Sequence, residues 1–113
     1  ILQHNTPPVP DKIDVYFTNN VGWSKVNYYC WGAATMTWPG AQMTKAYTND
    51  MGQDVYKVTV DPDVYQNIIF NNGAGGDANQ TVDIIIDTTS DKIGYYISDP
   101  SYSGKKSVGT WQP

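Results

Sequence analysis

The stretch DVYKVTV, residues 54–60, alternates Val55 and further apolar side chains with polar ones, and it ends at the turn pair Asp61-Pro62. A period of two is typical of a β-strand, because successive side chains point to opposite faces of a sheet. An Asp-Pro pair favours a turn and so closes such a strand. The stretch therefore predicts a strand with one buried face.

Similar short runs follow one another along the chain, with turn residues between them. No window carries the amphipathic period of a helix, and the loop NNGAGGDAN, residues 71–79, suits neither a helix nor a strand. About seven short strands at roughly even spacing predict an all-β protein built as an antiparallel β-sandwich. The expected strands cover residues 13–17, 25–31, 54–60, 68–70, 81–86, 92–97 and 108–111.

Length and composition indicate one domain behind a short tail. A chain of 113 residues, 40% of them hydrophobic, can bury a core without disulfides or metals. Residues 1–12, ILQHNTPPVPDK, hold three of the seven prolines, so we expect a linker tail there and a β-sandwich domain over residues 13–113. Because the chain begins with Ile1 rather than Met, we expect a monomeric module taken from a larger, multidomain protein.

The distribution of charged and apolar residues excludes two classes of partner. The net charge is −4, and the seven basic residues are spread along the chain rather than clustered. A surface that follows nucleic-acid phosphates needs clustered Lys and Arg. The sequence also has no apolar run long enough to span a bilayer. We therefore expect neither a nucleic-acid partner nor a membrane partner.

The residues that enzymes and metal sites need are scarce. Glu is absent, and the only His, His4, lies in the Pro-rich tail, a poor position from which to activate the only Cys, Cys30. We interpret Cys30 as a small buried hydrophobe. No H-x-x-x-H or C-x-x-C pair is present, and Asp77 in its loop is weak evidence for calcium. We expect no catalytic residue, metal or cofactor, while a facing pair of Asp carboxylates of the glycosidase kind stays open.

The predicted strand at residues 25–31 has two unlike faces. One face carries Val26, Tyr28 and Cys30, which suit a core. The other face combines a charge and an amide with two flat rings, an unusual set for a core. Its members are Lys25, Asn27, Tyr29 and Trp31.

A third ring, Trp38, follows in the turn sequence Trp38-Pro39-Gly40. Aromatic rings dominate protein cores, so one interpretation buries them all inside the sandwich. Three rings that converge from a polar strand face and a rigid turn favour the other interpretation, a platform at the surface. Such a platform suits a sugar, whose apolar face stacks on a ring while its hydroxyl groups bond to neutral amides.

The chain resembles the starch-binding domains of carbohydrate-binding module family 26. The resemblance rests on four segments taken together, and it runs from about residue 15 to residue 86. It implies an immunoglobulin-like β-sandwich without catalytic activity, attached to extracellular amylases or to cell-surface starch-binding proteins. The segments are VYFTNNVGWSKVNYYCW, TWPGAQMTK, GQDVYKVTVD and NIIFNNGAGGDANQTVDI.

The resemblance also implies a binding site. In the family, rings from the strand at residues 26–31 and the Trp of the Trp-Pro-Gly turn hold the curved face of an α-glucan. By position these are Tyr29 and Trp38, with Trp31 on the same strand face. The family often has Tyr where this chain has Asn27, so the remaining stacking contact falls to either Tyr28 or Trp31.

Amides near the loop at residues 71–79 complete the expected site. Asn71, Asn72 and Gln80 are candidates for bonds to sugar hydroxyl groups, although Asn72 equally suits a plain Asn-Gly turn. The expected partners are starch and maltooligosaccharides, and the expected location is extracellular or at the cell surface. The alternative is an immunoglobulin-like spacer or adhesion domain that binds no sugar and keeps its rings in the core.

Overall fold

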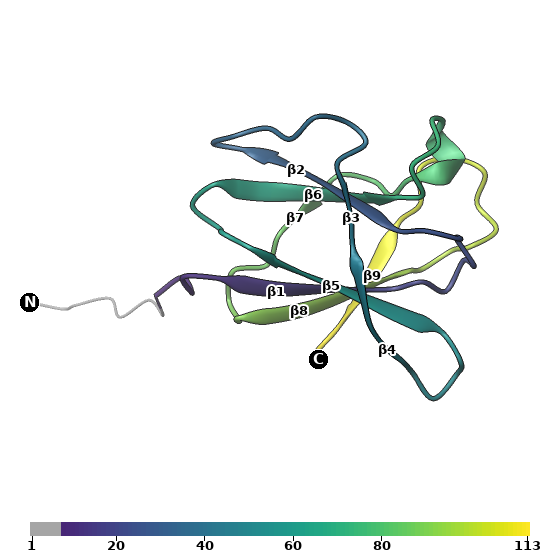
Figure 1. Cartoon of the computed structure of the whole chain (residues 1–113), viewed down its shortest axis with the longest axis horizontal. Helices are drawn as coiled ribbons and strands as arrows, with labels where there is room; N and C mark the ends of the chain where they lie inside the picture. Colours follow the sequence, from purple (N-terminus) through teal and green to yellow (C-terminus); the bar gives the residue numbers. More distant parts are fainter. Residues whose placement is uncertain (1–7) are drawn as a thin grey trace, which may run out of the picture.

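A computed structural model describes residues 8–113, in which nine strands form two sheets. The larger sheet has the order β4-β5-β1-β8-β9, and the smaller has the order β3-β2-β6-β7. Figure 1 shows the two sheets as layers packed face to face. The strands are β1 (Ile13–Thr18), β2 (Asn27–Gly32), β3 (Ala41–Gln42), β4 (Thr44–Thr48), β5 (Asp54–Val60), β6 (Tyr65–Asn71), β7 (Ile84–Ile85), β8 (Lys92–Ile97) and β9 (Val108–Trp111).

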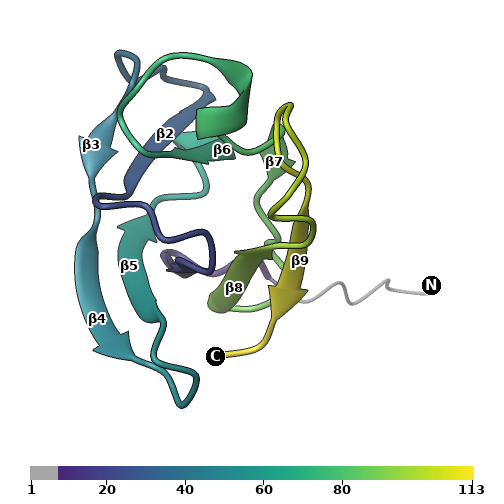
Figure 2. The same ribbon diagram turned by 90° about the vertical axis from the view of Figure 1, so that its right-hand side faces the viewer.

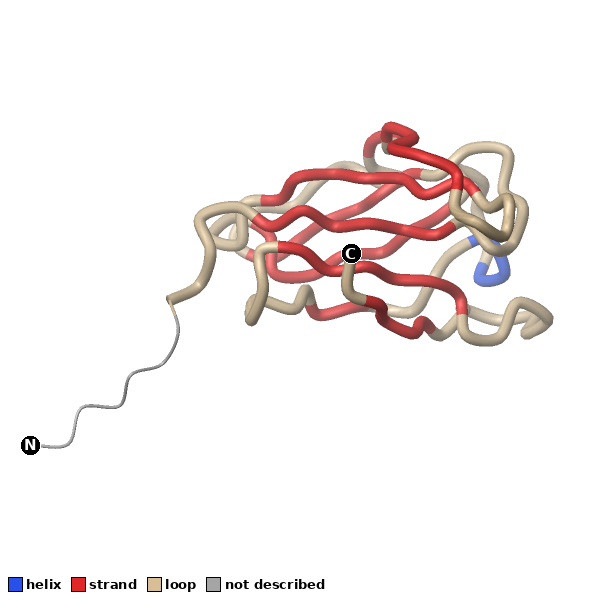
Figure 3. Tube along the Cα trace, turned by 90° about the horizontal axis from the view of Figure 1, so that it is seen from below, coloured by secondary structure: helices blue, strands red, loops and turns tan. Residues whose placement is uncertain are grey.

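The fold class expected from the sequence, an immunoglobulin-like antiparallel β-sandwich, is confirmed. All neighbouring strands in the two sheets run antiparallel except β1 and β8, which are parallel. Figure 3 looks onto the larger sheet from below and shows its strands lying side by side, with loops at both ends. No helix among the described residues is long and apolar enough to cross a membrane.

The core lies between the inner faces of the two sheets. Phe17 from β1 stacks on Phe70 from β6 with 4.6 Å between ring centroids, and both side chains are fully buried. Val26 and Cys30 from β2 point into the same core, as the period-two interpretation of that strand predicts. The sequence therefore assigns the inner face of β2 correctly.

The sequence misses two strands, β3 and β4, because neither carries a burial pattern. Every residue of both strands is exposed, so hydrophobic alternation gives no signal there. The expected strand at residues 81–86 shortens to β7, Ile84–Ile85. The loop after β6 also contains one turn of 3-10 helix, η1 (Asp77–Asn79), which the sequence analysis excluded. Of the expected tail, residues 1–7 lie outside the described residues.

The chain crosses from the smaller sheet to the larger one between β3 and β4. Met43, the residue between these strands, is buried in the core. Figure 2 shows β3 and β4 following one another along one side of the molecule. Because of this crossing, the loop before β3 lies over the smaller sheet and the hairpin after β4 extends the larger one.

Gly40 brings the loop that precedes β3 against β2. Its φ is +88°, and a Cβ atom there would overlap the carbonyl oxygen of Tyr28. Gly52, in the β4–β5 hairpin, has a similar φ of +75° but no heavy atom near its Cβ position. Both glycines have a left-handed backbone, but only Gly40 lies against another strand. Substituting each in turn therefore separates the free-energy cost of the backbone conformation from the cost of the steric clash.

We expect Gly40→Ala to lower the free energy of unfolding by at least about 3 kcal/mol, because the new methyl group must push the loop off β2. Gly52→Ala, the matched control, should cost only about 1 kcal/mol for its left-handed conformation. Urea unfolding followed by Trp fluorescence measures both values. Equal losses in the two variants would contradict the close packing of the loop on β2.

Candidate functional site

Three aromatic rings meet on the outer face of the smaller sheet, and we call them the ring cluster: Tyr29, Trp31 and Trp38. Tyr29 lies in the middle, with its centroid 5.5 Å from Trp31 and 5.1 Å from Trp38. Its plane makes an angle of 31° with Trp31 and of 67° with Trp38. The sequence expectation that these three rings converge at the surface is met by this geometry.

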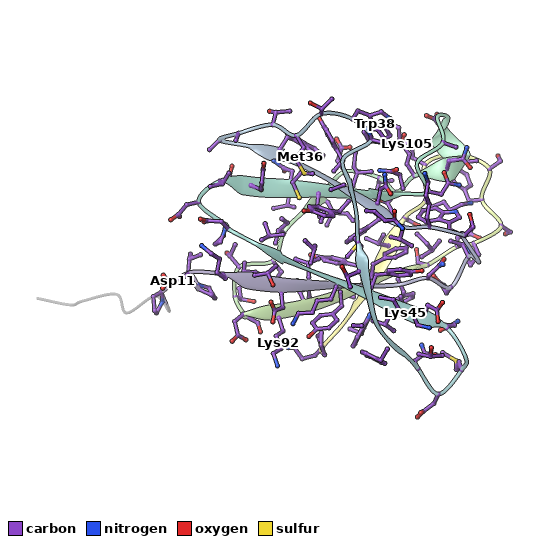
Figure 4. The ribbon with its side chains drawn as sticks, in the orientation of Figure 1. Asp11, Met36, Trp38, Lys45, Lys92 and Lys105 are labelled. Carbon is purple, nitrogen blue, oxygen red and sulfur yellow. The ribbon has the colours of Figure 1, made fainter. Side chains whose placement is uncertain are left out.

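The cluster combines exposure with stiffness. Trp38 is 40% exposed, and Figure 4 places it on the side of the smaller sheet that faces away from the larger sheet. Its loop is held to β2, because the N–H of Met36 donates to the carbonyl of Cys30 (3.0 Å) and the N–H of Cys30 donates to the Met36 sulfur (3.3 Å). A ligand therefore meets rings that already have their orientation.

Tyr28 lies on the opposite face of β2 from the ring cluster. It packs against the buried core, and burial, with smaller contributions from Cys30 and Tyr65, raises its pKa. Tyr28 therefore points away from the ring cluster, since period two turns it inward, and a stacking contact from Tyr28 stays a prediction that this geometry does not support. Of the two alternatives, Trp31 is the one beside Tyr29.

Asn27 shares the outer face of β2 with Tyr29 and is only 7% exposed. Its Oδ1 is buried and accepts no hydrogen bond from residues 8–113. A buried acceptor of this kind ordinarily takes a hydrogen bond from an ordered water or a ligand. Asn27 therefore places beside the rings a buried acceptor that no donor from residues 8–113 satisfies, and its role in binding stays a prediction.

Asn71 has a structural role that the sequence analysis did not foresee. It is fully buried, its Nδ2 donates to the carbonyl of Pro39 (3.1 Å), and its Oδ1 accepts from the N–H of Gly73 (2.8 Å). This geometry does not support the expected contact between its amide and a sugar hydroxyl group, because the side chain is fully buried, and that contact stays a prediction. Asn71 instead ties the Trp38 loop to β6.

The two other amide candidates differ from each other. Asn72 holds its own turn, since its Oδ1 accepts from the N–H of Ala74 (3.0 Å) and its Nδ2 donates to Asn79 (3.1 Å). The turn interpretation of Asn72 is thus the correct one. Gln80 is half-buried and pairs with Asn71 through an isolated β-bridge. Its side-chain amide makes no hydrogen bond to the described residues, so it stays available to a ligand.

Strand pairing adds residues to this surface that the sequence analysis missed. Asn67 on β6 faces Trp31 and donates from Nδ2 to the Trp31 carbonyl (3.2 Å), and Ile85 on β7, 82% exposed, faces Asn67. Ile69 faces Tyr29 and forms the floor below it. The run Ile68–Phe70 reads as continuous core, so only the register with β2 reveals which of its residues faces outward.

Two further kinds of site considered in the sequence analysis are a metal centre and a reactive thiol. No group of three or more His, Cys or Asp side chains among residues 8–113 could hold a metal ion. Cys30 is fully buried, and burial raises its pKa to about 12, so the thiol stays protonated. His4, its only His partner in the sequence, lies outside the described residues.

Comparison with known proteins identifies the class of this chain. The family model for starch-binding module 26 matches residues 15–85, and the chain belongs to that family of non-catalytic binding modules. An α-amylase of Butyrivibrio fibrisolvens is 40% identical over 72 residues, which are 63% of this chain and 7% of the amylase. The chain therefore spans only a small part of that relative. The resemblance inferred from the four sequence segments is confirmed.

Solved structures share the fold. The family 26 chain CBMbc of Amy13K from Eubacterium rectale, crystallised with maltoheptaose, matches 96% of this chain and 53% of its own length with a TM-score of 0.56 and 21% identity. The module CBM25-1 of a β/α-amylase from Paenibacillus polymyxa matches 91% of this chain and 94% of its own length with a TM-score of 0.62 and 19% identity. At these identities the likeness extends to the fold alone.

We expect Cys30 to be inert toward thiol reagents while the protein is folded, because a thiol with a pKa of about 12 holds almost no thiolate at about pH 8. Unfolded chains in guanidinium should react within minutes, since the thiol then regains its ordinary pKa. Absorbance of the reagent's leaving group follows both reactions. Labelling of the folded protein at the unfolded rate would contradict the burial of Cys30.

Proposed function

We propose that the ring cluster of this starch-binding module holds a segment of α-1,4-glucan. The observation that carries the proposal is the 67° angle between the planes of Tyr29 and Trp38. Consecutive α-1,4 linkages make a chain that curves, so neighbouring glucose units present their apolar faces at an angle. Two rings set at an angle can each stack on a different unit of such a chain.

Polar groups around the cluster support the same ligand. The half-buried amide of Gln80 offers donors and an acceptor for sugar hydroxyl groups, and the buried Oδ1 of Asn27 can accept from an ordered water that bridges to the sugar. Neither of these side chains carries a charge, so the position suits a neutral ligand. Because the rings form an open surface rather than an enclosed pocket, little of the ligand is buried and we expect a modest affinity.

The module keeps a larger protein close to starch. Its resemblance to a short part of an α-amylase supports a place within a multidomain chain, where the β-sandwich forms one domain behind the linker tail. The shared segment with an α-amylase, whose polymeric substrate is too large to cross a membrane, supports a place outside the cell or at its surface. Hydrolysis belongs to another part of such a protein, since starch-binding modules of this family are not catalytic.

We expect Trp38→Ala to weaken binding of maltoheptaose at least about tenfold, a loss of about 1.4 kcal/mol or more, because the second ring plane disappears. Trp38 is exposed, so the fold should survive. Tyr102→Ala is a matched control, since Tyr102 is 56% exposed and lies outside the ring cluster. Isothermal titration calorimetry measures both variants. Unchanged affinity in a folded Trp38→Ala protein would refute the ring cluster as the site.

Ligand shape provides a separate test of the angle between the rings. Maltoheptaose and β-cyclodextrin should compete for one site, and the cyclic sugar should bind at least as well because it is already curved and loses less conformational freedom. Cellohexaose, a flat β-1,4 chain, should not compete. Competition calorimetry compares the three sugars. Equal affinity for cellohexaose would contradict the angled arrangement, and a protein that binds none of them would be the spacer domain instead.

A further inference from the structure

A second hollow lies on the opposite side of the sandwich, on the outer face of the larger sheet that Figure 3 shows from below. It has a volume of about 490 Å³, within the range of small-molecule sites. We call it the sheet groove. Tyr47 and Tyr96 form its two walls, and Thr18 and Val55 lie between them. The ring cluster contributes no residue to this groove.

Strand register builds the sheet groove. Tyr47 on β4 pairs with Val55 on β5, Val55 pairs with Thr18 on β1, and Thr18 pairs with Tyr96 on β8. These four side chains therefore stand in one row across four strands. With about 4.8 Å between strands, the two Tyr backbones lie about 14 Å apart over a floor of short side chains. Two rings on either side of a low floor make a trough.

The wall at Tyr96 is stiff. A Cβ atom on Gly109 would overlap the Tyr96 ring, and a Cβ atom on Gly94 would overlap the ring of Trp111. Each ring thus lies flat over a Gly of the neighbouring strand. The indole N–H of Trp111 donates to the Tyr95 carbonyl (3.4 Å), which fixes this ring as well. These rings keep their positions without a ligand, as ready-made stacking surfaces do.

Both walls stay accessible. Tyr47 is 44% exposed and Tyr96 is 38% exposed, although each has an apolar ring that burial would stabilise. Met51, in the hairpin beside the groove, is 78% exposed. Apolar rings that are rigidly held and yet open to solvent point to a surface that receives a ligand.

The chemistry of the lining is neutral, because no charged side chain lines the groove. Nearby charges pair with each other outside it, as Lys45 does with Asp54 (3.1 Å) and Lys57 with Asp14 (3.5 Å). At the rim, the Oε1 of Gln53 accepts from Asn49 (2.9 Å), while its Nε2 donates to no described residue. Flat rings with a neutral amide donor suit an uncharged, hydroxyl-bearing ligand with apolar faces, which is a sugar.

We propose that the sheet groove is a second carbohydrate-binding site, which holds a separate segment of α-glucan on the face opposite the ring cluster. The choice of α-glucan among neutral sugars rests on the proposed function of the module. Because the two Tyr residues of the groove stand about 14 Å apart instead of meeting edge to face, the groove binds fewer sugar units and binds them more weakly. One module then contacts two chain segments at once.

The test uses the whole chain with the ring cluster weakened by Trp38→Ala, titrated with maltoheptaose and followed by ¹H–¹⁵N NMR, which reports the two faces separately. We expect the amide signals of Tyr47, Met51 and Tyr96 and the indole signal of Trp111 to shift together with millimolar affinity. Adding Tyr47→Ala should weaken these shifts about fivefold or more. Tyr102→Ala in the same background is the matched control and should leave the affinity unchanged within about twofold.

Each outcome decides between the two sites. Shifts confined to the ring cluster of the unmodified protein would overturn the groove and leave the proposed function intact. An unmodified protein that shows no shift at all with maltoheptaose would overturn both proposals. Groove signals that move with protein concentration in the absence of sugar would assign the groove to a second copy of the chain and overturn it. If the Tyr47→Ala variant does not fold, the pattern of shifts in Trp38→Ala alone decides the matter.

Discussion

The stacked contact between Phe17 and Phe70 is the constraint on which both outer faces depend. It joins β1 of one sheet to β6 of the other, and it continues to Trp23 on one side and Tyr95 on the other with centroid distances of 5.7 and 5.8 Å. Each fully buried Phe side chain stabilises the fold by about 1.5–3 kcal/mol. Because these inward rings close the sandwich, the fold does not require Tyr29, Trp31 or Trp38 to be buried. The period of two then leaves one face of every strand free for binding.

The outward rings of the smaller sheet need a different kind of support, since no second layer covers them. Contacts with the backbone supply this support. Gly40 packs against the Tyr28 carbonyl, Met36 is hydrogen-bonded to the backbone of Cys30, and the Asn71 side chain donates a hydrogen bond to the Pro39 carbonyl. These contacts lie at the base of the loop that carries Trp38. A loop held in this way loses little freedom when a sugar binds, and the small contact area of a few rings is then enough for a usable affinity. Asn71 therefore serves binding through the position of the loop rather than through a contact of its own.

Much of the fold and part of the site follow from alternation alone. Buried strands such as β1, β5 and β8 show a clear pattern, and alternation along β2 separates Tyr28 from Tyr29. Exposed strands such as β4 show no pattern, so their pairing cannot be read from the sequence. Because strand pairing cannot be read from the sequence, three features of the site also stay hidden: the place of Asn67, the outward orientation of Ile69 and the hydrogen bonds of the buried Asn71. Each depends on which residues of another segment lie opposite.

Val55 shows why the sheet groove stays hidden at the sequence level. Its 1% exposure and its place in an alternating strand make it look like a core residue, yet it pairs with Thr18 on the outer face and forms the floor between two rings. The inner positions of β5 are instead Tyr56, Val58 and Val60, which pack on the core. A floor residue is buried by its neighbours rather than by the opposite sheet. If the ring cluster and the groove on the opposite face both bind glucan as proposed, a chain segment bound at one site raises the local concentration of glucan at the other. Two weak sites on a rigid sandwich can therefore hold a starch granule more firmly than either site holds a soluble oligosaccharide, without any new contact.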